Sequence, residues 1–490
     1  MSDVFLHGLE SEEKDAGNPR FVNTIDSGVI FVTGTAPSMS SALYGYNQPF
    51  VALGYNDRPK GLGSTGTLPD QLDRIFAQAG RHSQTVVCNI VEEGDTLAET
   101  QANIIGSQAL RTGLFALARV QPEFNLKPKL LSGAGFTSNR PTTGVATVNL
   151  TEGGTGYTSA PAVIITPANG DVTGSGATAV CTINLAGEVD EVIIVTPGHL
   201  YTAPPTVGFA GGGGTGAAAT LSLGVVANPV AAVLNQLCNR YRAMTVVTAT
   251  NTTPEAAIQY RLDFDSDRMM IVDPMEKVQR GTGIVSMPAD AAILGLQSRV
   301  DYEEGFWVSP SNHVLEGTLG THRPIEHSLS DRSVESQYLN KNHVSTIVRS
   351  PSGGWKLFGN RVAKSDPLHA FWSVRRAHDV IIESIELANE PFLDKPFSKQ
   401  NLVDIAETVN KALRRWTALG ATLGGRVWLD PVLNTPESLS NGLIYIHYDG
   451  EAPAPMEHIV FVFNRNTGYY RTVFEDAARE IARSSGAAAL

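Results

Sequence analysis

Short, uniformly apolar runs alternate along the chain with longer segments in which apolar residues recur every three or four positions. The apolar runs predict buried strands and the periodic segments predict amphipathic helices. The strands are expected at residues 28–34, 85–91, 128–135, 244–250 and 268–274, and the helices at residues 67–80, 101–120, 229–243 and 253–261. Fully apolar strands that alternate with helices are typical of a parallel sheet covered on both faces. The sequence therefore predicts an α/β core.

The helix expected at residues 67–80 carries a signal at each end. Thr67 and Asp70 have the spacing of a capping box, in which two side chains bond the free amides of the first helical turn. Gly80 suits the C-terminal stop. We therefore expect this helix to begin with Thr67 as its cap.

Residues 142–224 interrupt the alternation. Their composition turns to Gly, Thr, Ala, Val and Pro, and the stretch GTGYTSAPAVIITP (154–167) is echoed by GHLYTAPPTVGFAG (198–211), with Tyr157 matching Tyr201. A repeat of this kind predicts two similar units, here rich in strands. Insertions of this size are tolerated at exposed loops, so the repeat module is expected to protrude from the α/β domain.

The last third of the chain predicts a mixed α+β unit. Residues 401–420 form an amphipathic pattern in which Leu402, Ile405, Val409, Leu413 and Trp416 line one side, and Glu407 and Lys411 have the favourable i, i+4 spacing. Two strands are expected at residues 443–450 and 458–465, around a proline-rich turn. A further amphipathic helix is expected within residues 471–490. Its apolar side consists of Val473, Phe474, Ala477 and Ile481.

Charge and composition exclude several classes of protein. The formal net charge of −12 is opposite to the basic excess that nucleic-acid binding requires. No run reaches the about 18 apolar residues of a membrane span, and the acidic N-terminus lacks the pattern of a signal peptide, so we expect a chain that folds in a cytoplasm. The three cysteines lack metal-ligand spacing, and we expect no metal site, no cofactor and no disulfide framework.

The polar stretch at residues 309–331 is the best candidate for catalysis in the sequence. A hydrolase could use Ser309 or Ser311 with His313 or His322. The spacing of its histidines does not match a helical zinc site. Prolines and glycines mark it as a series of tight turns, in which polar side chains commonly bond the backbone. We favour a structural loop and expect no catalytic residues.

Many segments of the chain resemble the contractile tail sheath proteins of bacteriophages and related contractile injection systems. The resemblance covers most of the chain outside the repeat module. It is carried by VFLHGLE (4–10), VIFVTGTAP (29–37), GTLPDQLDRIFAQAG (66–80), PKLLSGAGFT (128–137), NTTPEAAIQYR (251–261), RMMIVDP (268–274), GFWVSPSNHVLEG (305–317), RPIEHSLSD (323–331), LFGNR (357–361) and FWSVRRAHDVIIESI (371–385). It implies a parallel α/β middle domain that is subtilisin-like in fold but not catalytic, and an α+β C-terminal domain with exchanged terminal strands. On this basis the chain divides into an N-terminal arm (1–22), a middle domain in two parts (23–141 and 225–375), the inserted all-β repeat module (142–224), a C-terminal domain (376–470) and a tail (471–490).

The resemblance also implies the function. Sheath subunits stack as rings around a tail tube and contract, which drives the tube through the host envelope. Neighbouring subunits are joined by exchanged strands, and the matching residues are Val4, Phe5, Leu6, His7, Ile459, Val460, Phe461, Val462 and Phe463. A helix faces the tube in relatives. The matching residues are Lys411, Arg414 and Arg415, for which a merely solvated face is the equally open alternative.

The partners implied are further copies of the chain, the tail tube protein, and baseplate and tail terminator or neck proteins, with no nucleic acid and no membrane insertion. The location implied is the tail sheath of a virion, assembled in the host cytoplasm. Besides the hydrolase, the open alternative is a surface adhesin that binds through the repeat module.

Overall fold

The computed structural model describes residues 22–54 and 58–485. The chain divides into two units, one ending at Ala454 and the other beginning at Pro455. The N-terminal strand residues Val4, Phe5, Leu6 and His7 lie outside the described residues. None of the helices in the described ranges combines the length and the apolarity that a membrane crossing needs.

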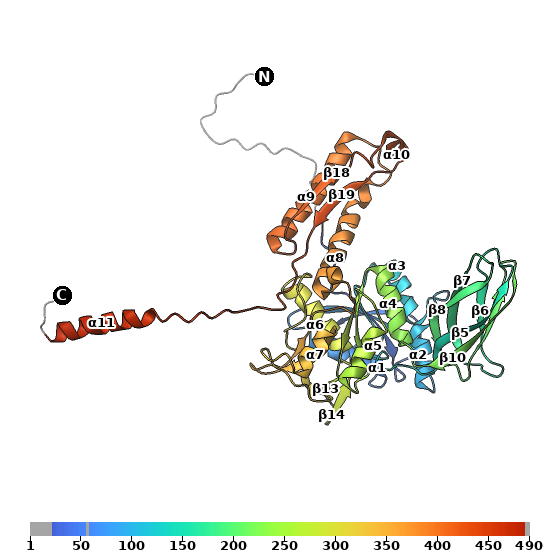
Figure 1. Cartoon of the computed structure of the whole chain (residues 1–490), viewed down its shortest axis with the longest axis horizontal. Coiled ribbons are helices and arrows are strands. Elements are labelled where there is room, and N and C mark those ends of the chain that lie inside the picture. Colours follow the sequence, from blue (N-terminus) through green and yellow to red (C-terminus); the bar gives the residue numbers. More distant parts are fainter. Residues whose placement is uncertain (1–21, 55–57, 486–490) are drawn as a thin grey trace, which may run out of the picture. The chain divides into compact units, whose positions relative to one another are not determined.

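The first unit is built on one large twisted sheet (Figure 1). Its strands run, in spatial order, β17 (Trp355–Phe358), β16 (Val344–Arg349), β12 (Met269–Val272), β11 (Met244–Thr248), β4 (Leu130–Ser132), β1 (Ile30–Thr35), β3 (Gln84–Val91) and β2 (Phe50–Gly54). All strands from β16 to β3 are parallel, and only the edge strands β2 and β17 pair antiparallel. The expected parallel sheet is therefore present, with an antiparallel strand at each edge.

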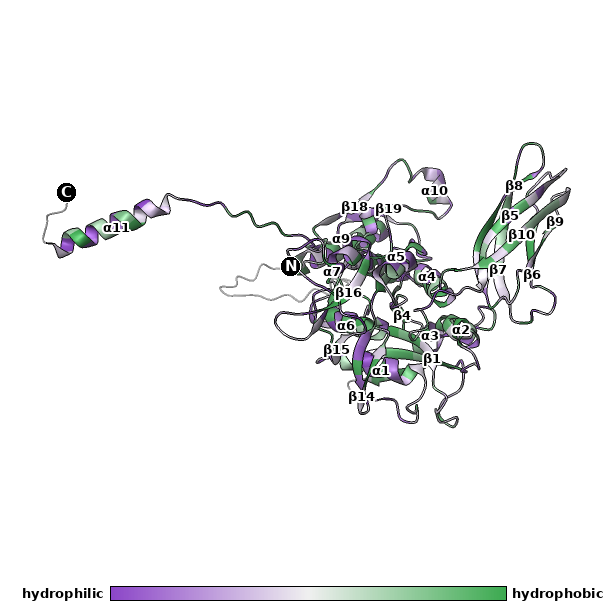
Figure 2. Ribbon diagram, turned by 60° about the horizontal axis from the view of Figure 1, so that its bottom comes forward, coloured by the Kyte–Doolittle hydropathy of each residue, from purple (hydrophilic) through white to green (hydrophobic). Residues whose placement is uncertain are grey.

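Helices cover both faces of this sheet, and each face forms its own hydrophobic core (Figure 2). One core contains α1 (Thr67–Ala77) and α6 (Asp290–Glu303). The other contains α2 (Leu97–Ile105), η1 (Gly113–Ala116), α3 (Leu117–Phe124), α4 (Pro229–Tyr241), α5 (Pro254–Leu262) and α7 (Glu335–Lys341). A small sheet of β14 (Gly283–Met287), β13 (Glu276–Arg280) and β15 (Thr318–Thr321) lies in the same unit.

The prediction of a single helix at residues 101–120 is wrong. The helix α2 ends at Gly106, whose φ is 69°, and a turn follows to Gly113, whose φ is 59°. A Cβ atom at Gly106 would lie 2.2 Å from the carbonyl oxygen of Thr112. The backbone conformation and this close approach both require glycine at position 106, and the helix ends there. The apolar residues keep their helical spacing across this break, so the sequence pattern does not reveal it.

The expected capping box at Thr67 is also wrong. The N-cap of α1 is Gly66 and has no side-chain cap. Thr67 instead accepts a hydrogen bond from the Thr35 amide and donates its own amide to the Thr35 hydroxyl, each at 3.1 Å. The side chain that was expected to cap a helix therefore ties that helix to the end of β1.

The strands between residues 144 and 224 explain the sequence repeat. They are β5 (Gly144–Thr155), β6 (Ala162–Thr166), β7 (Ser175–Ile183), β8 (Val189–His199), β9 (Thr206–Ala210) and β10 (Thr215–Gly224). The first strand of each repeat pairs with the third strand of the other, because β5 pairs with β10 and β8 pairs with β7, while the middle strands β6 and β9 pair with each other. The two repeats therefore complete one another's sheets.

Glycine and tyrosine recur at equivalent places in this arrangement. Tyr157 and Tyr201 are 5% and 3% exposed. A Cβ atom at Gly214 would lie 2.5 Å from the ring of Tyr157, and one at Gly174 would lie 2.3 Å from the ring of Tyr201. Each ring thus packs against a backbone that only glycine allows, which accounts for the residues that the repeats share.

The C-terminal part of the first unit contains α8 (Trp372–Asn389), α9 (Lys399–Leu419), α10 (Pro436–Ser440) and a two-stranded sheet of β18 (Gly425–Leu429) and β19 (Ile446–Gly450). Its core joins Val409, Leu413 and Trp416 of α9 to apolar residues of α8. The side of α9 predicted to be apolar is therefore buried at these positions. The expected pair of Glu407 and Lys411 is present, with 3.6 Å between Oε2 and Nζ.

The second unit holds α11 (Tyr469–Ser484), and residues 455–466 form neither helix nor strand. The helix agrees with the pattern in the sequence. The prediction of a strand at residues 458–465 is wrong for the single chain. A segment counts as a strand only where its backbone is hydrogen-bonded to another strand, and this segment has no such partner in the described residues.

The repeat module should be removable. Gly144 pairs with Gly224, and the Val226 amide donates to the Pro141 carbonyl at 2.9 Å, so the two ends of the insertion already lie together. The module also has hydrophobic clusters of its own. Replacing residues 144–224 by a short Gly-Ser linker should leave the thermal unfolding midpoint of the remaining chain nearly unchanged in calorimetry.

The matched control removes residues 141–226 and with them the closing hydrogen bond. That variant should be less stable by about 1 kcal/mol. Failure of the 144–224 replacement to fold would show that the module is part of the main core.

Candidate assembly surfaces

Consecutive apolar side chains are exposed in the second unit. Ile459, Val460, Phe461, Val462 and Phe463 are 57%, 68%, 91%, 76% and 91% exposed. Val, Ile and Phe are strand-forming residues, and an exposed apolar run of this kind marks an interaction site. The segment predicted to be an exchanged strand is therefore accessible to a partner.

The sheet of β18 and β19 can accept further strands. It has only two strands among the described residues, so each strand has an unpaired outer edge. Two-stranded sheets are marginally stable alone, and open edges pair readily with other chains. Leu413 of α9 packs beneath it, with its Cδ2 atom 3.1 Å from the position of a Cβ at Gly425. The sheet is thus supported from one side and open at both edges.

The two ends of the described part of the first unit meet in the core beside this sheet. Val22, the first described residue, and Ala452 are 5% and 2% exposed and belong to the same cluster as Leu413 and Trp416. The Trp416 indole also donates to the Thr24 hydroxyl at 3.2 Å. The chain segments at Val22 and Ala452 therefore both lie near the open sheet.

The basic residues predicted on α9 lie on its exposed side. Lys411, Arg414 and Arg415 are exposed, and Lys411 pairs with Glu407 on the same helix. Ala412 and Leu413, which lie between them, and Trp416, which follows them, are buried in the core. This helix presents a basic stripe to solvent.

The histidines of residues 309–331 have separate partners. The contacts are His313 Nε2 to Glu304 Oε1 at 2.7 Å, His322 Nδ1 to Ser286 Oγ at 2.9 Å and His327 Nδ1 to Ser336 Oγ at 3.0 Å. The hydroxyl of Ser309 accepts from the Ser311 amide, and that of Ser311 accepts from the Gly359 amide. Within the described residues, the hydroxyls of Ser309 and Ser311 therefore form no hydrogen bond with the imidazoles of His313 or His322, and no cluster of metal-ligating residues forms.

A row of ion pairs joins α8 to the α/β core. Arg376, Asp379, Glu383 and Glu386 are spaced by three or four residues and therefore share one face of the helix. Their partners are Asp301 of α6, Arg268 before β12, Lys129 before β4, and Arg242 after α4. The first three pairs are buried, with side chains no more than 9% exposed.

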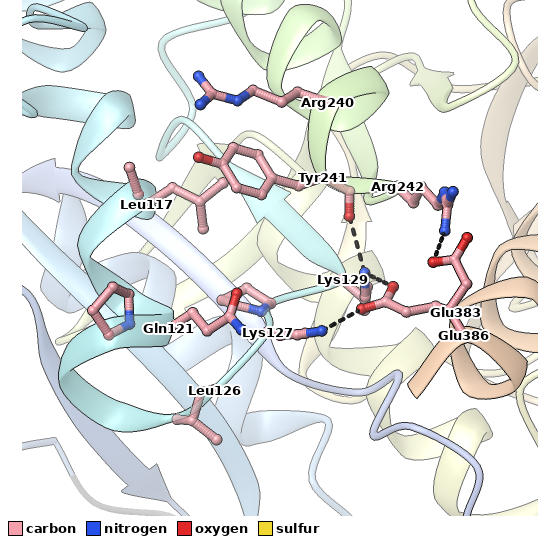
Figure 3. A pocket seen from close by; sticks show the side chains of 13 residues that line it. Leu117, Gln121, Leu126, Lys127, Lys129, Arg240, Tyr241, Arg242, Glu383 and Glu386 are labelled. Atoms are coloured by element: carbon pink, nitrogen blue, oxygen red, sulfur yellow. Dashed lines mark hydrogen bonds and ion pairs between the residues drawn. The ribbon is translucent and has the colours of Figure 1, made fainter. Parts of the chain in front are cut away.

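Glu383 occupies one of the two middle positions of this row, and Figure 3 shows it beside Lys127 and Lys129. It pairs with Lys129, whose amine also donates to the Tyr241 carbonyl at 2.9 Å, and with Lys127 at 3.3 Å. Burial lowers the pKa of Lys129, and the neighbouring carboxylate opposes that effect. The lysine is therefore held charged by its partner in a site that disfavours charge.

The ion-pair row was missed by reasoning from the sequence. Its only local signal is the three- and four-residue spacing of charges on α8, which usually indicates a solvated face. The partners lie at least 75 residues away along the chain. Only the folded structure brings them together.

Removing one partner of the central pair should be costly. In Glu383→Ala, Lys129 is left buried without its carboxylate, so the free energy of unfolding should fall by about 3–5 kcal/mol in urea denaturation. Glu407→Ala removes a carboxylate from the exposed pair with Lys411 and should cost less than about 1 kcal/mol. Equal losses in the two variants would contradict the role assigned to the buried row.

Comparison with known proteins identifies relatives over most of the chain. A family model described as the phage tail sheath protein central domain matches residues 219–362. The tail sheath protein of Burkholderia phage BcepMu is 28% identical over 96% of this chain and 99% of its own, and that of Escherichia phage P2 is 26% identical over 94% and 95%. A prophage major tail sheath protein of Pseudomonas aeruginosa is 33% identical over 44% of this chain; the chain spans 56% of that relative.

Solved structures share the fold. The sheath complex of an extracellular contractile injection system, PVC, in its contracted state has a TM-score of 0.56 at 12% identity, covering 96% of this chain and all of its own. The contracted helical sheath of the anti-feeding prophage has a TM-score of 0.54 at 16% identity, covering 94% and 100%. The resemblance inferred from the sequence and the mixed α/β fold are both confirmed.

Proposed function

The chain is a structural subunit of a contractile tail sheath, and we propose that it polymerises as stacked rings around a tail tube. Contraction of the stack would drive the tube through a host envelope. The observation that carries this proposal is the presence, in one chain, of an exposed strand-forming segment at residues 459–463 and an open two-stranded sheet. The first is a donor and the second an acceptor for strand addition between copies.

Strand exchange would connect each subunit to its neighbours. The segment Ile459–Phe463 of one copy adds to an edge of the β18–β19 sheet in the next, and residues Val4–His7 of the N-terminal arm supply the other added strand. The buried positions of Val22 and Ala452 support this arrangement, because both arms then start beside the sheet of their own subunit. Main-chain hydrogen bonds make few demands on side chains, so such a joint can persist while the subunit bodies rotate.

The work of contraction would come from burial between subunits. Full burial of a Val, Ile or Phe side chain contributes roughly 1.5–3 kcal/mol, and the donor segment alone exposes five such residues. We propose that the middle domain is subtilisin-like in fold and acts as the rigid body that repacks, and that the repeat module decorates the outside. No step of this cycle requires catalysis by the chain.

The setting proposed is the tail sheath of a virion or the sheath of a related injection device, assembled in the cytoplasm of the host. Baseplate and tail terminator or neck proteins would contact the two ends of the stack. The sequence similarity to phage tail sheath proteins supports this setting.

A proline in the donor strand should prevent assembly. Val460→Pro removes one backbone donor and obstructs pairing, so the chain should fold normally by circular dichroism but form no tubes or rings in negative-stain microscopy. Val460→Thr keeps the strand propensity and the backbone donor, and it should assemble. Normal tubes from Val460→Pro would refute strand exchange through this segment.

The basic stripe on α9 is proposed to face the tail tube. Exposed charges form weak contacts, which suits an interface that must be released on contraction. Replacing Lys411, Arg414 and Arg415 together by Glu should weaken co-sedimentation with the tube protein about tenfold or more and should leave folding intact.

A matched variant separates contact from net charge. Arg332, Lys341 and Arg349 are also exposed, and their replacement by Glu changes the net charge by the same amount at a different place. Tube binding should survive this change. An equal loss of binding in both variants would favour the alternative, in which these residues of α9 form a merely solvated face.

A further inference from the structure

The helix α11 has an apolar face that stays exposed among the described residues of its own unit. Tyr470, Val473, Phe474 and Ile481 are 70%, 67%, 74% and 66% exposed. Figure 2 shows hydrophobic and hydrophilic residues alternating along this helix, as in an amphipathic helix. A helix of this length is marginal in water unless its apolar face packs against something. This face therefore has the character of a contact surface.

The first unit contains a groove whose lining combines apolar residues with polar ones. The groove has a volume of about 830 Å³ and is lined by Ile25, Val29, Leu126, Leu387 and Leu393. Leu387 and Leu393, at the end of α8 and just after it, are 45% and 73% exposed. The groove thus presents accessible apolar side chains along one wall.

Acidic residues accompany this apolar lining. Asp26, Glu386 and Glu390 line the groove, together with Lys127. On α11, Arg471 lies next to Tyr470 at the border of the apolar face. Arg471 already pairs with Glu475 on its own helix, and Glu386 pairs with Arg242, so charge adds little here and the contact would rest on the apolar side chains.

The groove lies close to the proposed docking sheet. Ile25, which lines the groove, and Tyr448 of β19 pack against the same hydrophobic cluster, so the groove is near that strand. Only residues 464–468 separate the donor strand from α11. Five extended residues span at most about 18 Å. A strand bound beside β19 would therefore place the start of the following helix within about 18 Å of that sheet.

We propose that α11 of one subunit packs its apolar face into this groove of a second copy of the chain. The assignment rests on the strand exchange proposed above and adds a second point of attachment to it. Two linked contacts bind far more tightly than either alone, because the second forms at high effective concentration. The helix would act as a latch that keeps the donor strand in place.

Paired cysteines test which copy holds the helix. Ala477 lies on the apolar side of α11 and Leu393 lines the groove, while the native cysteines are buried and free. Subunits with Ala477→Cys, mixed with subunits with Leu393→Cys and assembled, should form a disulfide-linked dimer under mild oxidation. Chains that carry both changes should form covalent ladders. Cross-linking within single chains, or none in tubes that form normally, would overturn the latch and leave the proposed function standing.

A charge on either side of the contact tests its contribution. Phe474→Glu and, separately, Leu387→Glu should raise the critical concentration for assembly roughly tenfold or more, which corresponds to the loss of one buried apolar side chain. Thr472→Glu adds the same charge on the polar side of α11 and should change the critical concentration for assembly less than about twofold. Equal effects of Phe474→Glu and Thr472→Glu would contradict the proposal. Failure of the unaltered chain to assemble with tube and baseplate would overturn the proposed function and the latch with it.

Discussion

The attachment of α8 to the α/β core is the constraint on which the rest of the architecture depends. Arg376, Asp379 and Glu383 are buried with their partners, and a buried charge is tolerated only where an opposite charge and hydrogen bonds meet it. If the contact were only apolar, α8 could shift along the core at little cost. The ion pairs form in only one position of α8 relative to the core. The ion pairs therefore fix how the C-terminal domain is held on the body, even where they contribute little to net stability.

This rigid attachment matters because of what the C-terminal domain carries. The open β18–β19 sheet and the first residues of both arms are packed against the core formed by α8 and α9. In the proposed sheath, strain between neighbours would pass through the exchanged strands into α8 and from there into the body. A joint that bends would dissipate that strain, and the paired charges at successive turns of α8 oppose bending.

The repeat module illustrates a different solution to stability. Its two repeats complete each other's sheets and bury their own tyrosines. Its hydrophobic clusters therefore contain residues of the module and none of the main sheet. The large sheet, by contrast, has hydrophobic cores on both faces that combine segments from most of the first unit. The module can thus be carried by the chain without altering the packing that holds the body together.

The sequence alone determined the elements whose signal is local. The apolar runs predicted the parallel strands, the repeat predicted a β-rich module, and the spacing of Val409, Leu413 and Trp416 predicted the buried side of α9, because a residue's environment in these elements follows from periodicity. The break at Gly106 and the role of Thr67 depended on close approaches to Thr112 and Thr35, which periodicity does not encode. The partners of Asp379 and Glu383 and the groove beside Leu387 exist only after strands and helices far apart in the chain have packed. Tertiary structure decided them, since paired charges and concave surfaces are properties of segments brought together in space.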